Sequence, residues 1–196
     1  NKRLYNNDMV LKVLNFYKEA IKEYCEPTDK ELKSILFEKK NYSVKNSEIK
    51  DGFHIIFPYI NLYYKIRHLI IEYVIKKVQA DEMFNKYTNA DIIDRAVVSS
   101  NCWLLYRCCK PNKEPYYVSK YYDNNNTCIN VENLGSDKDI ISLLSLRDSR
   151  WNDSSQTKIK ETFNDNTISD AYSELGVKKE KANVMGNLMT EEKTEL

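Results

Sequence analysis

Glycine is the residue that this sequence most clearly lacks. Four glycines occur in 196 residues, and residues 1–130 contain a single one, Gly52. It stands in "KDGFHIIFPYI", two residues before His54 in an otherwise apolar run. Glycine at the start of a strand is needed where the backbone takes a positive φ or where another group approaches closely. A simple turn glycine is the alternative interpretation.

Paired cysteine motifs and a membrane-spanning run are missing as well. The five cysteines form no CxxC pair and their number is odd, which argues against structural zinc and against a secreted disulfide framework. We therefore expect reduced thiols in a cytosol-like compartment. The longest apolar segment, "INLYYKIRHLIIEYVI", contains Lys65, Arg67 and Glu72, so it predicts no membrane span. No signal peptide is visible, and the first residue is Asn rather than Met, which suggests a piece of a longer protein.

The chain also lacks a strong net charge, which is +1 overall. Residues 1–130 hold 21 Lys or Arg against 16 Asp or Glu, and the remaining residues hold 9 against 13. A mildly basic body with an acidic tail permits contact with nucleic acid without establishing it. The hydrophobic content of 42% and aromatic content of 12% indicate a folded globular protein, with room for one domain and a tail.

The apolar pattern predicts alternating helices and strands. Apolar residues at helical spacing predict helices over 8–25, with Asp8 as its cap, and over 60–79. Short apolar runs predict the remaining elements as strands, at 35–37, 52–58, 91–100, 102–109 and 116–122. A polar loop is expected between the first two strands. This order favours an α+β domain with a mixed or antiparallel sheet and flanking helices.

The last third of the sequence changes in character. Ser136 with Asp139 predicts a capped helix through Leu146. From Arg147 onward the composition is dominated by Ser, Asp, Asn, Thr, Lys and Glu. We therefore expect a domain over residues 1–147 and a flexible polar linker over residues 148–196.

His54 is the first candidate for a functional residue. Alternation along its strand places His54 and Ile56 on one face, and Phe53, Ile55 and Phe57 on the other. The phenylalanine face suits a core, so His54 could face a cleft. A histidine with a purely structural role is the alternative interpretation.

Asp94, Arg107 and Lys110 are further candidates. Asp94 lies in "ADIIDRAVV", where a carboxylate is costly to bury unless it is paired, hydrogen-bonded or bound to a metal ion. Arg107 and Lys110 follow an apolar run and precede Pro111. Basic side chains at the end of a strand suit phosphate binding, and a solvated sheet edge is the alternative.

The order and spacing of these segments resemble one family. "KDGFHIIFP", then "IIDRAVVSSNCWLLYRCCKP" about forty residues later, then "LLSLR", resemble the primase domain of the helicase–primases of poxvirus-like and giant DNA viruses. The resemblance covers about residues 1–147. It implies the archaeo-eukaryotic primase superfamily and part of its RRM-like catalytic core.

The resemblance also implies roles for individual residues. Three motifs meet in one cleft of that superfamily: a DxD pair, a small residue–x–His motif matched by Gly52-Phe53-His54, and a hydrophobic–Asp motif matched by Ile93-Asp94. By resemblance, His54 and Asp94 would be catalytic. Asp94 would bind Mg²⁺ or Mn²⁺, and His54 would contact the incoming nucleotide beside the backbone of Gly52. Lys110 and Arg107 would balance the triphosphate, although the family pattern has a small residue at the position of Arg107. Hard oxygen ligands and cations are what two-metal nucleotidyl transfer requires.

The sequence departs from the family in one respect. No DxD pair on an apolar strand occurs in residues 1–50, and no Walker-type helicase signature occurs. We therefore expect the C-terminal part of a primase catalytic domain, inactive alone, whose parent protein makes primers from NTPs on single-stranded DNA. The implied partners are the template, the NTPs and a C-terminal superfamily-3 helicase domain, at an intracellular site of viral replication. A non-catalytic nucleic-acid-binding or scaffold remnant and an unrelated α+β interaction domain are the alternatives.

Overall fold

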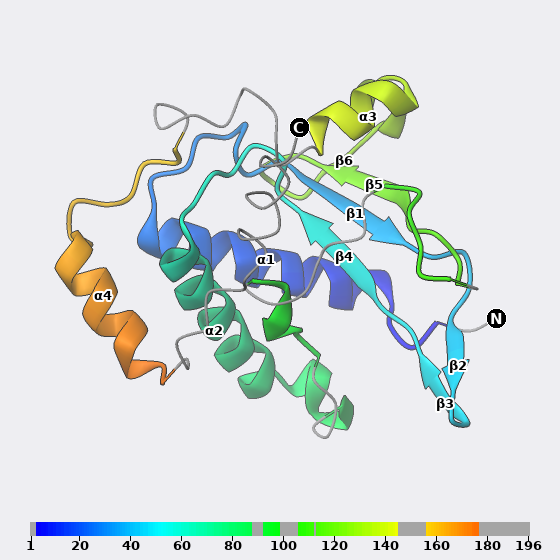
Figure 1. Ribbon diagram of the computed structural model, residues 1–196, viewed down its shortest axis with the longest axis horizontal. Helices are drawn as coiled ribbons and strands as arrows, with labels where there is room; N and C mark the ends of the chain where they lie inside the picture. The colour runs from blue at the N-terminus through cyan, green and yellow to red at the C-terminus, as the bar shows by residue number, and fades with distance from the viewer. Residues whose placement is uncertain (1–2, 88–91, 99–105, 112, 145–155, 177–196) are drawn as a thin grey trace, which may run out of the picture.

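A four-stranded antiparallel sheet with helices packed against it forms the body of the protein (Figure 1). The computed structural model describes residues 3–87, 92–98, 106–111, 113–144 and 156–176. The helices are α1 (Asn7–Tyr24), α2 (Tyr64–Ala80), α3 (Asp137–Leu143) and α4 (Asp165–Glu174). The strands are β1 (Ser34–Glu38), β2 (Ser43–Lys45), β3 (Glu48–Lys50), β4 (Phe53–Ile56), β5 (Tyr117–Tyr122) and β6 (Cys128–Ile129). The predicted α+β class with an antiparallel sheet is confirmed.

The register of the sheet decides which side chains share a face. The strand order is β4–β1–β5–β6, with β1 antiparallel to both of its neighbours. Phe37 of β1 lies opposite His54 of β4 on one side and Val118 of β5 on the other. One row further along, Ile35 lies between Ile56 and Tyr121. Residues directly opposite one another in antiparallel strands point to the same face.

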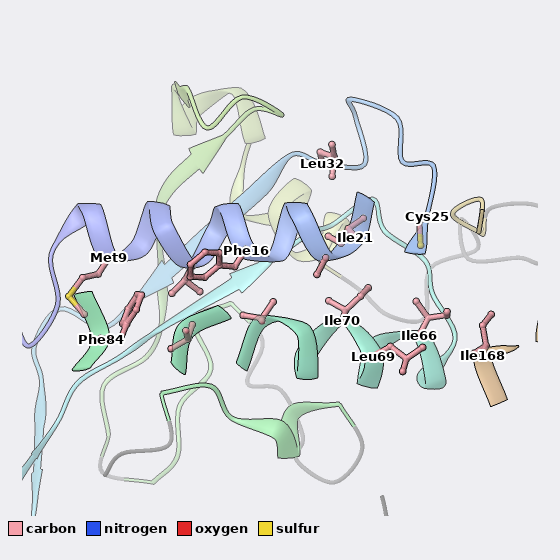
Figure 2. Packing of buried hydrophobic residues seen from close by; sticks show 14 residues of the cluster. Met9, Phe16, Ile21, Cys25, Leu32, Ile66, Leu69, Ile70, Phe84 and Ile168 are labelled. Atoms are coloured by element: carbon pink, nitrogen blue, oxygen red, sulfur yellow. The ribbon is translucent and has the colours of Figure 1, made fainter. Parts of the chain in front are cut away.

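Helix α1 contacts both the sheet and α2. Its Val10 and Leu14 pack against Leu36 and Tyr122 of the sheet. The main core forms between α1 and α2, and Figure 2 shows its side chains facing one another across the two helices. Its labelled members are Met9, Phe16, Ile21, Cys25, Leu32, Ile66, Leu69, Ile70, Phe84 and Ile168. The helix predicted for residues 8–25 is therefore confirmed, although its cap is Asn6, which accepts a hydrogen bond from the Met9 amide, and not Asp8.

The strand predictions are confirmed in part. The runs at 35–37, 52–58 and 116–122 contain β1, β4 and β5, and the helix predicted for 60–79 is α2. Two expectations are wrong. The expected polar loop contains the hairpin β2–β3, and the expected strand over 91–100 contains instead a short 3₁₀ helix, η2 (Arg95–Val97). Of the run 102–109, residues 106–109 form a turn and irregular backbone, and the rest lies outside the described residues.

The C-terminal part differs from the expected linker. The capping box of Ser136 and Asp139 is confirmed, and α3 ends at Leu143. Beyond it, Ile159 bridges to Cys25, and Ile168 of α4 is 1% exposed in the main core. Residues 156–176 are therefore packed against the body, contrary to the expectation of a poorly packed segment from Arg147. The domain boundary at 147–148 stays a prediction.

The described part of the chain shows two further features. None of its helices combines the length and the apolar character that crossing a bilayer requires. Its four cysteines are free thiols: Cys25, Cys108, Cys109 and Cys128. This agrees with the expectation of reduced cysteines for those four positions.

Candidate functional site

Strand β4 separates its side chains between two environments. Phe53 and Ile55 pack against the cores that involve α1, as does Phe57 just after the strand. Ile56 packs on the opposite face, in the cluster that includes Ile140 of α3. His54 shares that face because it alternates with Phe53 and Ile55. The predicted division of the strand is confirmed.

His54 is held by an aromatic contact that the sequence did not reveal. Its imidazole stacks on the ring of Tyr116, with ring centroids 4.1 Å apart and an interplanar angle of 21°. The Lys39 ammonium lies over the same Tyr116 ring, 4.9 Å from its centroid. Burial lowers the pKa of His54, Lys39 lowers it further, and Asp94 raises it. Burial and Lys39 together thus favour the neutral imidazole.

Gly52 does not take a left-handed backbone conformation. The glycines with positive φ in the described residues are Gly135 and Gly176. A Cβ built on Gly52 would meet no atom within 4 Å, so the space beside its backbone is open. Asp51 Oδ1 accepts a hydrogen bond of 3.0 Å from the Gly52 amide. A positive φ therefore does not explain the glycine at position 52. The backbone there does have room for another group to approach closely.

Asp94 occupies a different structural setting from the one predicted. It is the exposed N-cap of η2, and its Oδ1 accepts a hydrogen bond of 2.9 Å from the Ala96 amide. The prediction that Asp94 lies on a strand, within 91–100, is therefore wrong. Arg95 fixes this turn against α2 through two contacts with Glu72, of 2.5 and 2.9 Å. The Asp94 carboxylate nevertheless lies near enough to raise the pKa of His54.

Arg107 and Lys110 differ in how they are held. Arg107 has a φ of 61°, a backbone conformation that favours glycine. Its guanidinium forms an ion pair of 2.6 Å with Asp137 at the start of α3. Tyr106 donates a hydrogen bond of 3.0 Å to the same carboxylate. The Lys110 side chain is exposed, whereas the Arg107 guanidinium is already paired.

A cavity of about 260 Å³ lies beside the predicted residues rather than around them. Tyr121 lines it and sits one row of the sheet away from His54, on the same face. The other lining residues are Tyr59, Asn133, Leu134, Asp139, Ser142 and Leu143. The predicted site residues are therefore outside this cavity, and the site is a surface at the sheet edge.

The side chains around Asp94 offer few ligands for a metal ion. The described residues contain no cluster of three or more His, Cys, Asp or Glu side chains that could hold a metal ion. Asp94 alone does not make the multi-carboxylate site that two divalent ions require. Within the described part, the residues do not fit a complete two-ion centre.

Sequence reasoning missed Tyr116 and Lys39. Tyr116 was included at the start of a predicted strand, and Lys39 lay in a segment expected to be a polar loop. A weak signal existed, since Lys39 comes two residues after the run 35–37 and Tyr116 is the first residue of the run 116–122. Only the pairing of β1 with both β4 and β5 brings them to His54.

Comparison with known proteins gives the family. Residues 1–122 match the family described as the C962R protein N-terminal AEP domain, where AEP denotes archaeo-eukaryotic primase. The chain is 32% identical over 123 residues to candidate helicase L207/L206 of Acanthamoeba polyphaga mimivirus. It is 30% identical over 131 residues to candidate helicase 121R of Invertebrate iridescent virus 3. It is 25% identical over 148 residues to candidate helicase 184R of Invertebrate iridescent virus 6.

These matches differ in how much of each protein they cover. They include 60%, 62% and 65% of this chain, but only 13%, 14% and 15% of the three viral proteins. No solved structure matches the chain. The family match includes Gly52, His54, Asp94, Arg107 and Lys110, and it covers more than half of the sequence. This chain therefore belongs to the archaeo-eukaryotic primase family, in the group of C962R-type N-terminal AEP domains.

Proposed function

We propose that this chain is part of the primase domain of a viral replication protein that synthesises primers from NTPs on single-stranded DNA. The observation that carries the proposal is the surface around His54: the open backbone of Gly52 lies two residues before this imidazole, and the charge of the Asp94 carboxylate acts on it. Family membership and the helicase names of the relatives support it. We propose further that a superfamily-3 helicase domain follows in the same polypeptide and that the protein works at an intracellular replication site.

Each residue receives a role in this proposal. The neutral imidazole of His54 donates a hydrogen bond to a phosphate oxygen of the incoming nucleotide, and the open space at Gly52 lets that phosphate approach the backbone. Lys110, which is exposed, adds positive charge to the triphosphate. Arg107 contributes only if its ion pair with Asp137 opens.

The reaction is the transfer of a nucleotidyl group. The 3′-hydroxyl oxygen of the growing primer forms a bond to the α-phosphorus of the NTP and gives up its proton to solvent water. The bond from the α-phosphorus to the bridging oxygen breaks, and pyrophosphate leaves. Mg²⁺ or Mn²⁺ supplies charge neutralisation in such transfers. We propose Asp94 as one ligand, and further ligands would have to come from outside the described residues.

A primer-synthesis assay on the longer polypeptide that contains this chain tests the proposal. Asp94→Asn removes the charge but keeps an N-cap, since Asn caps as well as Asp does. We expect the variant to fold normally and to lose primer synthesis. His54→Ala should lower synthesis by about 10²-fold, the scale of one lost contact to a developing charge. Asp165→Asn, which alters an exposed carboxylate in the first turn of α4, is the matched control.

The outcome separates the enzyme from its main alternative. Full synthesis by Asp94→Asn, with the control also active, would show that the site is wrongly placed. Binding of single-stranded DNA without any synthesis by the unmodified polypeptide would favour a non-catalytic remnant of the same fold. One observation favours this second function. The Arg107 guanidinium is already paired with Asp137, so it is less available to bind a triphosphate.

A further inference from the structure

We infer that Lys39 is an additional triphosphate-binding cation of this site and that the Tyr116 ring positions Lys39 and His54 side by side. The inference rests on the proposed function and extends its binding site by two residues. Neither residue belongs to the motifs that identified the site. Both follow from the register and the ring contacts of the folded chain.

The strand register brings Gly52, Lys39 and Tyr116 into one row. Glu38, the last residue of β1, lies opposite Phe53 at the start of β4 and opposite Tyr117 at the start of β5. The next position along β1 is Lys39, and the residues just before β4 and β5 are Gly52 and Tyr116. All three therefore lie just beyond the same end of the sheet. The chain reaches this row from three separate segments.

The side chains of this row converge on the face that carries His54. Tyr116 stacks on His54 at 4.1 Å between ring centroids, and Lys39 Nζ lies 4.9 Å from the centroid of Tyr116. Two groups able to contact an anion are thus held by one aromatic ring. Arg3 donates a hydrogen bond to the Lys39 carbonyl, which fixes the backbone while leaving the ammonium at the ring.

Charges of both signs lie at this surface. The Asp51 carboxylate acts on Tyr116, but it is paired with Arg3. The Glu114 carboxylate is within reach of the Lys39 charge, but it is bound by Asn41. The Lys39 ammonium is close enough to lower the pKa of His54, and Asp94 is the carboxylate that acts in the opposite direction. Contact with an aromatic face is weaker than a charge-assisted hydrogen bond to phosphate. A triphosphate would therefore draw the Lys39 ammonium from the ring, while Tyr116 continues to hold the imidazole of His54.

Tyr116 also links this surface to the segment that carries Arg107 and Lys110. Its carbonyl accepts a hydrogen bond of 3.1 Å from the Arg107 amide. One residue therefore contacts His54 through its ring, Lys39 through the face of that ring, and the basic segment through its backbone. Tyr116 acts here as a positioning residue, and Lys39 as a ligand-contacting one.

Binding of inorganic tripolyphosphate to the 196-residue chain, measured by calorimetry, tests the inference. Lys39→Gln should weaken binding by about tenfold, the loss of one charge-assisted contact. Lys86→Gln is the matched control, because Lys86 also lies over a tyrosine ring, Tyr87, at 4.9 Å. We expect that variant to bind like the unmodified chain. Binding of ATP should follow the same order.

The Tyr116 variants add a readout that does not depend on binding. Tyr116→Leu removes the stacked ring, so the His54 ring-proton resonances should move in the NMR spectrum and tripolyphosphate binding should weaken about tenfold. Tyr116→Phe keeps the ring, and both properties should stay close to those of the unmodified chain. Circular dichroism checks that Tyr116→Leu remains folded. If this variant unfolds, tripolyphosphate binding by Lys39→Gln decides the inference.

The possible outcomes distinguish this inference from the proposed function. Unchanged binding by Lys39→Gln, with His54→Ala weakened, overturns the role of Lys39 and leaves the nucleotide site standing. Unchanged binding by both variants overturns the inference and also the assignment of His54. Failure of the unmodified chain to bind tripolyphosphate overturns the inference, and primer synthesis by the longer polypeptide then judges the function alone.

Discussion

Single residues at this site are better explained by their contacts than by their place in a motif. Asp94 was expected within a strand, yet it caps a short 3₁₀ helix, and its influence reaches His54 as a charge rather than as a strand neighbour. Arg107 combines a positive φ with an ion pair to Asp137, so its guanidinium is less available than that of a solvated side chain. The imidazole of His54 is the group on which burial, Tyr116, Lys39 and Asp94 all act.

Gly52 permits a test of its two interpretations. Gly52→Ala should change the free energy of unfolding by less than about 1 kcal/mol, and in the stabilising direction, because φ is not left-handed and the added Cβ meets open space. If phosphate approaches the backbone there, the methyl group should weaken NTP binding. Urea unfolding and NTP calorimetry on the same variant provide both measurements. Unchanged affinity would identify Gly52 as an ordinary turn residue.

At the scale of elements, local signals determined how much could be predicted. Helices α1 and α2 have strong helical spacing, and β1, β4 and β5 are apolar runs between polar segments, so each was identified. The capping box of Ser136 and Asp139 is a purely local signal and was found for the same reason. The strand predicted over 91–100 is wrong for the described residues 92–98, because an apolar run does not distinguish a strand from a turn packed against a core. Ile93 packs against the main core without belonging to a strand.

The helix α4 was missed because its surroundings are strongly polar. Its one buried residue is Ile168, which joins the main core near α2, and Asn164 caps the helix by accepting bonds from the amides of Asn166 and Thr167. A single buried side chain in ten residues gives little periodicity to detect. Local sequence signals also failed to reveal part of the site, because Lys39 and Tyr116 come together only when β1 pairs with β5.

The packing of α4 leads to a prediction about stability. Ile168→Ala should lower the free energy of unfolding by about 2–4 kcal/mol, the usual cost of emptying a fully buried isoleucine site. Ile141→Ala on α3 is the matched control, because that side chain is 52% exposed, and its effect should stay below about 0.5 kcal/mol. Chemical denaturation measures both. Equal, negligible effects would restore the linker interpretation of residues 156–176.

At the scale of the whole molecule, this chain corresponds to only a small part of its viral relatives. The three viral proteins are matched over 13–15% of their lengths, and the family match spans residues 1–122. Around His54 the described part places the Tyr116 ring, the Lys39 ammonium and the charge of the Asp94 carboxylate. Catalysis by two divalent ions requires more carboxylates than this. We therefore propose the activity for a longer polypeptide, in which other segments supply the further carboxylates.

The affinity for divalent metal ions should differ between the 196-residue chain and the longer polypeptide. Asp94 already accepts a hydrogen bond from the Ala96 amide, and Mg²⁺ gives up its water reluctantly to a single carboxylate, so we expect the 196-residue chain to bind Mg²⁺ or Mn²⁺ only weakly. The longer polypeptide should bind with higher affinity, and Asp94→Asn in that context should reduce it, because ligands from several segments then act together. Calorimetric titration of both proteins with each ion measures the difference. Binding by the 196-residue chain as tight as that of the longer polypeptide would mean that the chain itself holds the whole metal site, with ligands beyond Asp94.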